Sequence, residues 1–208
     1  MFTEETAAVI VSYNPDMDVF GQLLTSLSTQ CPAVVIDNGS SQNCIRSLKE
    51  LAGTYAHVEL LCSGDNMGIA YAQNTAANHI LKTNTHVRYI LMLDHDSIPD
   101  ENMVGVLMDT FESLVADGQK VAAVGPVLYD PRDNRLLKFH KLKIFYLGKI
   151  APERISINQP VVEVDGLNSS GTLIAIDAYH ATGGFEGSLF IDHVETDWCF
   201  RAKAAGYR

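Results

Sequence analysis

The sequence is short of basic residues and lacks the hallmarks of membrane or secreted proteins. Fifteen lysines and arginines stand against 25 aspartates and glutamates in 208 residues, giving a formal net charge of -10. This balance disfavours nonspecific binding to nucleic acid or to anionic membranes. No apolar stretch approaches the roughly 18 residues of a spanning helix, and no signal-peptide pattern opens the chain. We therefore expect no nucleic-acid partner and no transmembrane segment.

Several chemical motifs are also missing. The four cysteines have no C-x-x-C spacing, so reduced thiols in a cytoplasmic protein are the simplest interpretation. The absence of G-x-G-x-x-G and G-x-x-x-x-G-K-[ST] disfavours a dinucleotide oxidoreductase or a P-loop enzyme. The seven histidines show no H-x-x-x-H spacing that would indicate metal ligands.

The first half of the chain alternates strand-like and helix-like hydrophobic patterns. With 47% hydrophobic residues, the chain is long enough for one domain with a sizeable core. Strands are expected at residues 7–13, 33–37, 57–62, 89–93 and 121–124, with helices between them. This rhythm predicts an α/β fold with a mainly parallel, doubly wound sheet, whose ligands bind beyond the carboxyl ends of strands.

The second half loses this rhythm. Residues 136–150 mix bases, aromatics and aliphatics, and residues 151–160 are polar with two prolines, which indicates an excursion from the sheet. Strands are expected again at 161–164 and 172–176, followed by a short helix over 177–182. No repeat, low-complexity tract or linker indicates a domain boundary.

An apolar run that ends in two acids, YILMLDHDS over residues 89–97, is the most informative motif. If the chain stays extended, the strand period of two points Asp94 and Asp96 the same way, towards one hard cation such as Mg²⁺ or Mn²⁺. That cation would hold phosphate oxygens. The alternative is a core strand whose acids begin a loop, with Asp96 or Ser97 capping the next helix. This segment alone leaves both interpretations open.

Polar residues follow the first two predicted strands. Tyr13, beside Asn14, can stack on a base, and Asp37 can accept a hydrogen bond from the imide N–H of uracil or thymine or from a ribose hydroxyl. Ordinary turn chemistry explains the same residue types.

A second group surrounds the start of the helix expected over 68–81. Asn66, Gly68 and Asn74 accompany several alanines there, and a helix N-terminus suits a diphosphate. Close packing of the helix on the sheet explains the small residues equally well.

A third group lies in the segment FIDHVETDWCFRA near the end of the chain. Asp192, Glu195 or Asp197 can act as a general base if one of them reaches an acceptor hydroxyl. The alternative is that these acids cap a helix and favour its dipole.

The order of these groups closely resembles that of the inverting family 2 glycosyltransferases. The resemblance rests on VIVSYN, VVIDNGS, the helix start at Asn66 and Gly68, LDHDS and the final acid cluster. It implies the GT-A fold, a Rossmann-like nucleotide-diphospho-sugar transferase fold, over residues 1–208. Residues 1–125 would be the nucleotide-binding half and 126–208 the acceptor-side half. The final segment is most similar to bacterial rhamnosyltransferases of O-antigen and polysaccharide synthesis, which use dTDP-L-rhamnose.

The resemblance also implies roles for individual residues. Nucleoside contacts would come from Tyr13, Asn14 and Asp37, while Asn66, Gly68 and Asn74 would lie near the nucleoside or the diphosphate. The metal, Mg²⁺ or Mn²⁺, would bind Asp94 and Asp96.

The catalytic motif departs from the family pattern. Val194 replaces the first acid of the usual pair, so Glu195 becomes the preferred base, with Asp197 and then Asp192 as substitutes. The partners would be a nucleotide-sugar donor, dTDP-rhamnose or a UDP-sugar, and a saccharide or lipid-linked saccharide acceptor. Residues 168–171 and 141–146 are expected near the acceptor.

The family has further sequence beyond the position of Arg208, so we expect the chain to be truncated there. That sequence often forms a lid or a membrane-associating part, which would bring the protein to the inner face of the cell membrane. One alternative to an active transferase is therefore a non-catalytic nucleotide-sugar-binding fragment, in which donor binding survives without turnover. A haloacid-dehalogenase-type phosphohydrolase is a further alternative, although its Asp-x-Asp motif belongs near the first strand rather than at Asp94.

Overall fold

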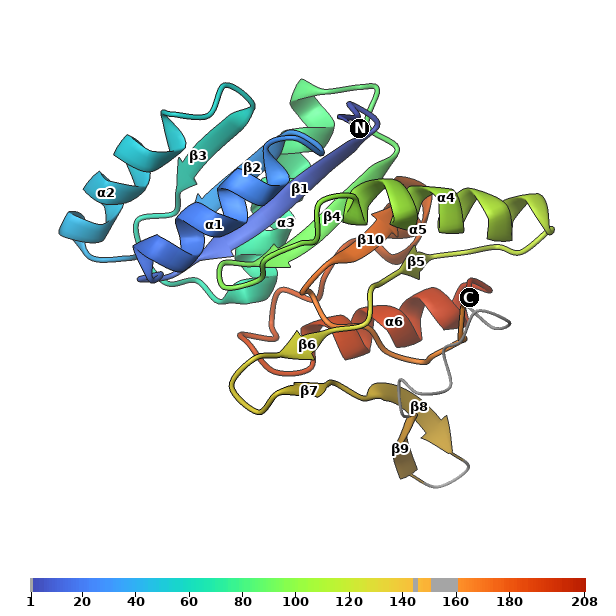
Figure 1. Ribbon diagram of the computed structural model, residues 1–208. Helices are drawn as coiled ribbons and strands as arrows, with labels where there is room; N and C mark the ends of the chain where they lie inside the picture. The colour runs from blue at the N-terminus through green and yellow to red at the C-terminus, as the bar shows by residue number, and fades with distance from the viewer. Residues whose placement is uncertain (1, 144–145, 151–160) are drawn as a thin grey trace.

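The computed structural model describes residues 2–143, 146–150 and 161–208, and its centre is a six-stranded sheet (Figure 1). The strand order is β3-β2-β1-β4-β10-β5. The strands are β1 (Thr6–Ser12), β2 (Ala33–Asp37), β3 (Val58–Cys62), β4 (Tyr89–Asp94), β5 (Ala123–Val124) and β10 (Thr172–Ala175). β1 is buried along its whole length, as a central strand covered on both faces should be.

Helices cover both faces of this sheet. They are α1 (Met17–Leu27), α2 (Gln42–Ala52), α3 (Ile69–Thr83), α4 (Met103–Ala116), α5 (Ile176–Thr182) and α6 (Val194–Ala204). The alternate residues of β1 separate into two cores: Ala8 and Ile10 pack with α1, α2 and α4, whereas Val9 and Val11 pack with α3, α5 and α6. This three-layer arrangement confirms the predicted α/β class.

The sheet is mainly parallel, as predicted, but β10 runs antiparallel to both of its neighbours. In the parallel part, Ser12 is in register with Asp37, and Val11 with Asp94. Because β10 is reversed, its first residue, Thr172, lies beside Met92 near the end of β4. The loop that precedes β10 therefore reaches the same edge as the carboxyl ends of β1, β2 and β4.

The described residues between β5 and β10 lie outside the main sheet, as predicted for residues 136–150 in their described part. They form two small antiparallel pairs, β6 (Tyr129–Asp130) with β7 (Arg135–Leu136) and β8 (Phe139–Lys143) with β9 (Tyr146–Ile150). The expected polar segment 151–160 lies outside the described residues. Among the helices of the described ranges, none is both long and apolar enough to cross a membrane.

The strand expected over residues 161–164 is wrong. These residues have no regular secondary structure. Their apolar side chains remain partly exposed, with Val161 38% accessible. The alternating pattern mimics a strand, but these residues pair with no strand in the part of the chain that the structure describes, and a strand requires a hydrogen-bonded partner.

Candidate active site

Asp37, at the end of β2, is fully buried. Its Oδ2 accepts hydrogen bonds from the backbone N–H groups of Gly39 and Ser40, at 3.2 and 3.1 Å. Its Oδ1 is also buried but has no hydrogen-bond partner among the described residues. A buried carboxylate oxygen without a donor is costly, so this atom is suited to accept a hydrogen bond from a ligand.

Asn14 joins the ends of β1 and β2. Its backbone N–H donates to Ser40 Oγ at 2.7 Å, and its Oδ1 accepts from the Ser41 N–H at 3.0 Å. Asn14 adopts a positive φ of 44°, which asparagine tolerates better than most residues. Asn14 therefore connects the loops that follow β1 and β2. The adjacent Tyr13 is 47% exposed, so its ring is accessible to a ligand.

Asn66 is tied to the β2 end through Asn38. Asn66 Oδ1 accepts from Asn38 Nδ2 at 3.1 Å and from the Gly68 N–H at 3.1 Å. Gly39 permits this approach, because a Cβ there would lie only 2.5 Å from the Asn66 backbone nitrogen. The predicted site residues Asp37 and Asn66 are thus brought together.

The start of α3 is covered by the loop before α6. The Ile69 N–H donates to the Phe190 carbonyl oxygen at 2.6 Å, and a Cβ at Gly68 would lie 2.6 Å from that same oxygen. Gly68 has a φ of +86° and caps the helix without a side chain. The Ile69 N–H, at the helix start that was predicted to suit a diphosphate, is therefore already bonded within the protein.

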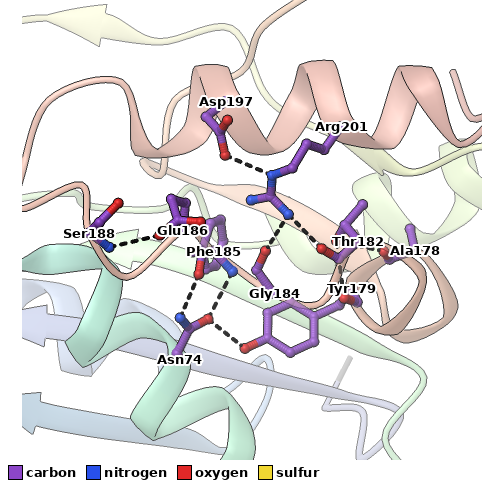
Figure 2. Close-up of polar contacts among 10 residues, drawn as sticks. All are labelled: Asn74, Ala178, Tyr179, Thr182, Gly184, Phe185, Glu186, Ser188, Asp197 and Arg201. Atoms are coloured by element: carbon purple, nitrogen blue, oxygen red, sulfur yellow. Dashed lines mark hydrogen bonds and ion pairs between the residues drawn. The ribbon is translucent and has the colours of Figure 1, made fainter.

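Asn74, on α3, takes part in a hydrogen-bond network with Tyr179 and Phe185 (Figure 2). Its Nδ2 donates to the Phe185 carbonyl at 2.8 Å, and its Oδ1 accepts from Tyr179 Oη and the Phe185 N–H, at 2.8 and 2.9 Å. Burial raises the pKa of Tyr179 to about 12, so its hydroxyl remains a donor at neutral pH. These contacts anchor the Phe185 loop to α3, whereas the proposed ligand contact of Asn74 stays a prediction.

Asp94 and Asp96 do not lie on one extended strand. The prediction that both side chains point the same way required an extended chain, and this requirement is not met. β4 ends at Asp94, and the Ser97 N–H donates to the Asp94 carbonyl at 3.1 Å, which closes a turn through Asp96. Ser170 Oγ donates to Asp94 Oδ2 at 2.5 Å. Asp96 is exposed, and it lines a groove together with Ser170.

The two aspartates nonetheless offer a donor set that fits Mg²⁺ or Mn²⁺. Both are hard oxygen donors, and neither Asp94 nor Asp96 forms an ion pair with a basic side chain in the described part of the chain. No group of three or more His, Cys, Asp or Glu side chains that could hold a metal occurs among those same residues. A cation held here would need phosphate or water as its other ligands, as is usual for Mg²⁺ beside a nucleotide.

Glu195, in the first turn of α6, lies close to the Asp94 end of β4. Ser169 Oγ donates to Glu195 Oε1 at 2.6 Å. Since Ser169 is followed directly by Ser170, whose hydroxyl bonds Asp94, both acids contact one dipeptide. Glu195 is half-buried, whereas Asp192 is exposed and precedes α6.

Asp197 forms an ion pair with Arg201, one turn further along α6 (Figure 2). The Arg201 Nε to Asp197 Oδ2 distance is 2.7 Å. Arg201 Nη1 also donates to the carbonyl oxygens of Thr182 and Gly184, at 2.6 and 2.8 Å. Asp197 is therefore paired with a basic side chain, whereas Glu195 forms no ion pair among the described residues, which favours Glu195 as the base.

The sequence indicated residues 168–171 only as acceptor surroundings; it did not predict the contacts of Ser169 and Ser170 with the two acids, or the ion pair of Arg201. The spacing of four residues between Asp197 and Arg201 on a predicted helix was a usable signal for their ion pair. The two serines carried no such signal, because their contacts join residues 26 and 76 positions apart.

The fold and the groups at its strand ends define a GT-A glycosyltransferase domain. The family model for glycosyl transferase family 2 matches residues 7–161, and the chain belongs to that family. It is 32% identical to the dTDP-rhamnosyl transferase RfbF of Shigella flexneri, over 96% of this chain and 63% of that protein. The chain thus spans less than two thirds of this relative.

Solved structures show the same fold at low sequence identity. The mannosyltransferase PcManGT of Pyrobaculum calidifontis, in complex with GDP-Man and Mn²⁺, is 16% identical with a TM-score of 0.69, over 100% of this chain and 54% of that one. GalNAc-T7 with UDP, GalNAc and Mn²⁺ is 12% identical with a TM-score of 0.71, over 96% and 40%. TarS of S. aureus in complex with UDP-GlcNAc is 12% identical with a TM-score of 0.59, over 97% and 54%.

Proposed function

We propose that the chain is the catalytic domain of a glycosyltransferase that moves L-rhamnose from dTDP-L-rhamnose to a saccharide acceptor, with inversion and with the help of a divalent metal. The observation that carries this proposal is that Glu195 and Asp94 accept hydrogen bonds from two consecutive serines of one loop, Ser169 and Ser170, respectively. Transfer needs a group that helps to hold the departing diphosphate and a base near the sugar, and we assign these tasks to Asp94 and Glu195, respectively.

The choice of donor is supported by the relative RfbF, whose name specifies dTDP-rhamnose. Asp37 Oδ1 is compatible with that donor, because thymine presents an imide N–H as a hydrogen-bond donor. Uracil presents the same group, so Asp37 would suit a donor with either thymine or uracil rather than thymine alone. Tyr13, exposed beside Asp37 at the same edge, would stack on the base.

In the proposed reaction, Glu195 accepts the proton of the acceptor hydroxyl. The resulting oxygen nucleophile attacks the anomeric carbon from the face opposite the nucleotide, the bond to the diphosphate oxygen breaks, and the configuration inverts. Ser169 would hold one oxygen of the Glu195 carboxylate during this step, leaving the other oxygen for the hydroxyl.

Asp94 and Asp96 would hold the metal, Mg²⁺ or Mn²⁺. When bound, the cation supplies Lewis-acid stabilisation of the negative charge on the departing diphosphate. The crystals of PcManGT and GalNAc-T7 contain Mn²⁺, which makes this ion the first to test.

Calorimetry tests the donor and metal parts of this proposal together. We expect dTDP to bind in the presence of Mn²⁺, more tightly than GDP, and to lose most of its affinity when Mn²⁺ is omitted or when Asp94 is changed to Asn. Asp109→Asn, an equal charge change on the exposed face of α4, serves as the control. Binding that is equally tight without Mn²⁺ would refute the assignment of Asp94 and Asp96.

A non-catalytic nucleotide-sugar-binding module is the second candidate, and Val194 is the observation that favours it. Val194 stands where the family pattern has an acid, and its side chain is fully buried in the core. Such a module would bind dTDP with Mn²⁺ but would not release dTDP from dTDP-L-rhamnose. Release that is measurable in the unchanged chain and falls strongly in Glu195→Gln would exclude it. Membership in family 2 already excludes the phosphohydrolase alternative.

A further inference from the structure

The loop before β10 contacts the site through two consecutive serines. Ser169 is buried and donates to Glu195 Oε1 at 2.6 Å, while Ser170 is half-buried and donates to Asp94 Oδ2 at 2.5 Å. Consecutive Cα atoms are about 3.8 Å apart, so one short piece of backbone sets where both hydroxyls lie. The carboxylates come from elements far apart in the sequence, the end of β4 and the first turn of α6.

This loop is held firmly on both sides of the serines. The Gly171 N–H donates to the Met92 carbonyl of β4 at 2.8 Å, and Thr172 Oγ1 donates back to the Asn168 carbonyl. Gly171 has a φ of +96°, and a Cβ there would lie 2.8 Å from Pro126 Cγ. Movement of the serines would therefore require these contacts to break or shift.

We propose that Ser169 and Ser170 are positioning residues with separate tasks, which rests on the proposed function of the site. Ser169 orients the Glu195 carboxylate towards the acceptor. Ser170 donates a hydrogen bond to Asp94 Oδ2 and would so leave Oδ1 as the freer oxygen for a cation. Because the two serines are adjacent in a loop held by several hydrogen bonds, they fix the position of the Glu195 carboxylate relative to the Asp94 carboxylate.

The two tasks predict that each serine variant affects a different measurement, the affinity for dTDP or the rate of dTDP release. Ser170→Ala should weaken the Mn²⁺-dependent binding of dTDP, measured by calorimetry, by about tenfold or more, the usual loss for a hydrogen bond to a charged group. Ser169→Ala should leave that affinity within about twofold and lower kcat for dTDP release from dTDP-L-rhamnose by about tenfold or more. Ser169→Thr, which retains a hydroxyl, should restore much of the rate.

A double variant tests whether Ser169 acts through Glu195. If it does, Ser169→Ala should produce no further loss of rate when Glu195 is already Gln. Ser113→Ala, at an exposed position of α4, controls for the loss of a serine hydroxyl and should leave both measurements unchanged.

The outcomes separate this inference from the proposed function. If the unchanged chain binds no dTDP with Mn²⁺, the proposed function fails and the inference fails with it. If the chain binds and releases dTDP but the two serine variants lower affinity and rate alike, or lower neither, only the inference is overturned. Additive losses in the Ser169→Ala, Glu195→Gln double variant would also overturn it.

Discussion

Asp37→Asn is a sharp test of the nucleoside site, because the two oxygens of Asp37 have different surroundings. Oδ2 accepts two backbone N–H groups, from Gly39 and Ser40, whereas Oδ1 is buried without a partner among the described residues. In the variant, the amide oxygen should take the position of Oδ2, since only an acceptor satisfies those two N–H groups. The amide nitrogen, a donor, then occupies the position of Oδ1.

The change therefore replaces an acceptor by a donor where the pyrimidine N–H is expected. A hydrogen bond to a charged group contributes about 1.5 to 3 kcal/mol, which corresponds to a loss of affinity of roughly 10- to 150-fold. Without nucleotide the effect on stability should be small or favourable, because a buried carboxylate oxygen that lacks a donor is itself unfavourable.

Two assays follow from this reasoning. Calorimetry with dTDP and Mn²⁺ should show the loss of affinity, and urea unfolding without nucleotide should show a free energy of unfolding equal to or above that of the unchanged protein. Asp109→Asn provides the control, since it removes the same charge from an exposed helix position.

Unchanged dTDP affinity in Asp37→Asn would refute the assignment of Oδ1 to the base. A large loss of stability without nucleotide would show instead that Asp37 serves the turn at the end of β2. In that case the contacts with Gly39 and Ser40 would be its main task.

Two further predictions concern the stability of the fold. Arg201→Ala should lower the free energy of unfolding by about 2 to 4 kcal/mol, because it removes a guanidinium that is 33% exposed and leaves one carboxylate and two carbonyl oxygens without their donor. Urea unfolding measures this, and a loss below about 0.5 kcal/mol would contradict it. The hydrogen bond from Tyr89 lowers the pKa of Glu112 below its ordinary value of 4.5. The ionised, exposed carboxylate therefore adds at most about 1 kcal/mol to the free energy of unfolding. This contribution is fully present above pH 4.5 and is lost as the pH falls through the lowered pKa. Glu112→Gln should therefore be less stable than the unchanged protein at pH 7 and equal to it at strongly acidic pH; a difference that persists in acid would be the contrary result.

The parallel half of the fold was predictable because its local patterns and its tertiary role agree. The observed β2, Ala33–Asp37, has the bounds that the apolar run and the following Asn-Gly turn predicted. The direction of β10 was not predictable, since hydrophobic alternation is the same for a strand in either direction. The pattern at 161–164 was misleading for a related reason, because a pattern does not supply a partner strand.

The candidate site was predictable to the level of segments but not of contacts. Asp37, Asn66, Asp94 and Glu195 all lie in the segments that the sequence indicated, at one edge of the sheet or in contact with it. The turn at Asp96 and the involvement of Asn74 with Phe185 depend on long-range packing, which short motifs do not report. Their roles towards donor and metal remain predictions.

The reversed strand β10 has a consequence for how this domain tolerates change. The hydrogen bond between Ser170 and Asp94 joins residues 76 positions apart, and most of the intervening chain lies outside the main sheet. Each doubling of such a connection adds only about 0.6 kcal/mol of closure entropy, provided the new chain remains flexible. Segments of different length and composition can therefore be exchanged between β5 and β10 while the register of β10 on β4 returns the serines to the same place. We therefore predict that replacement of that segment changes the acceptor preference and leaves the nucleotide preference as it is.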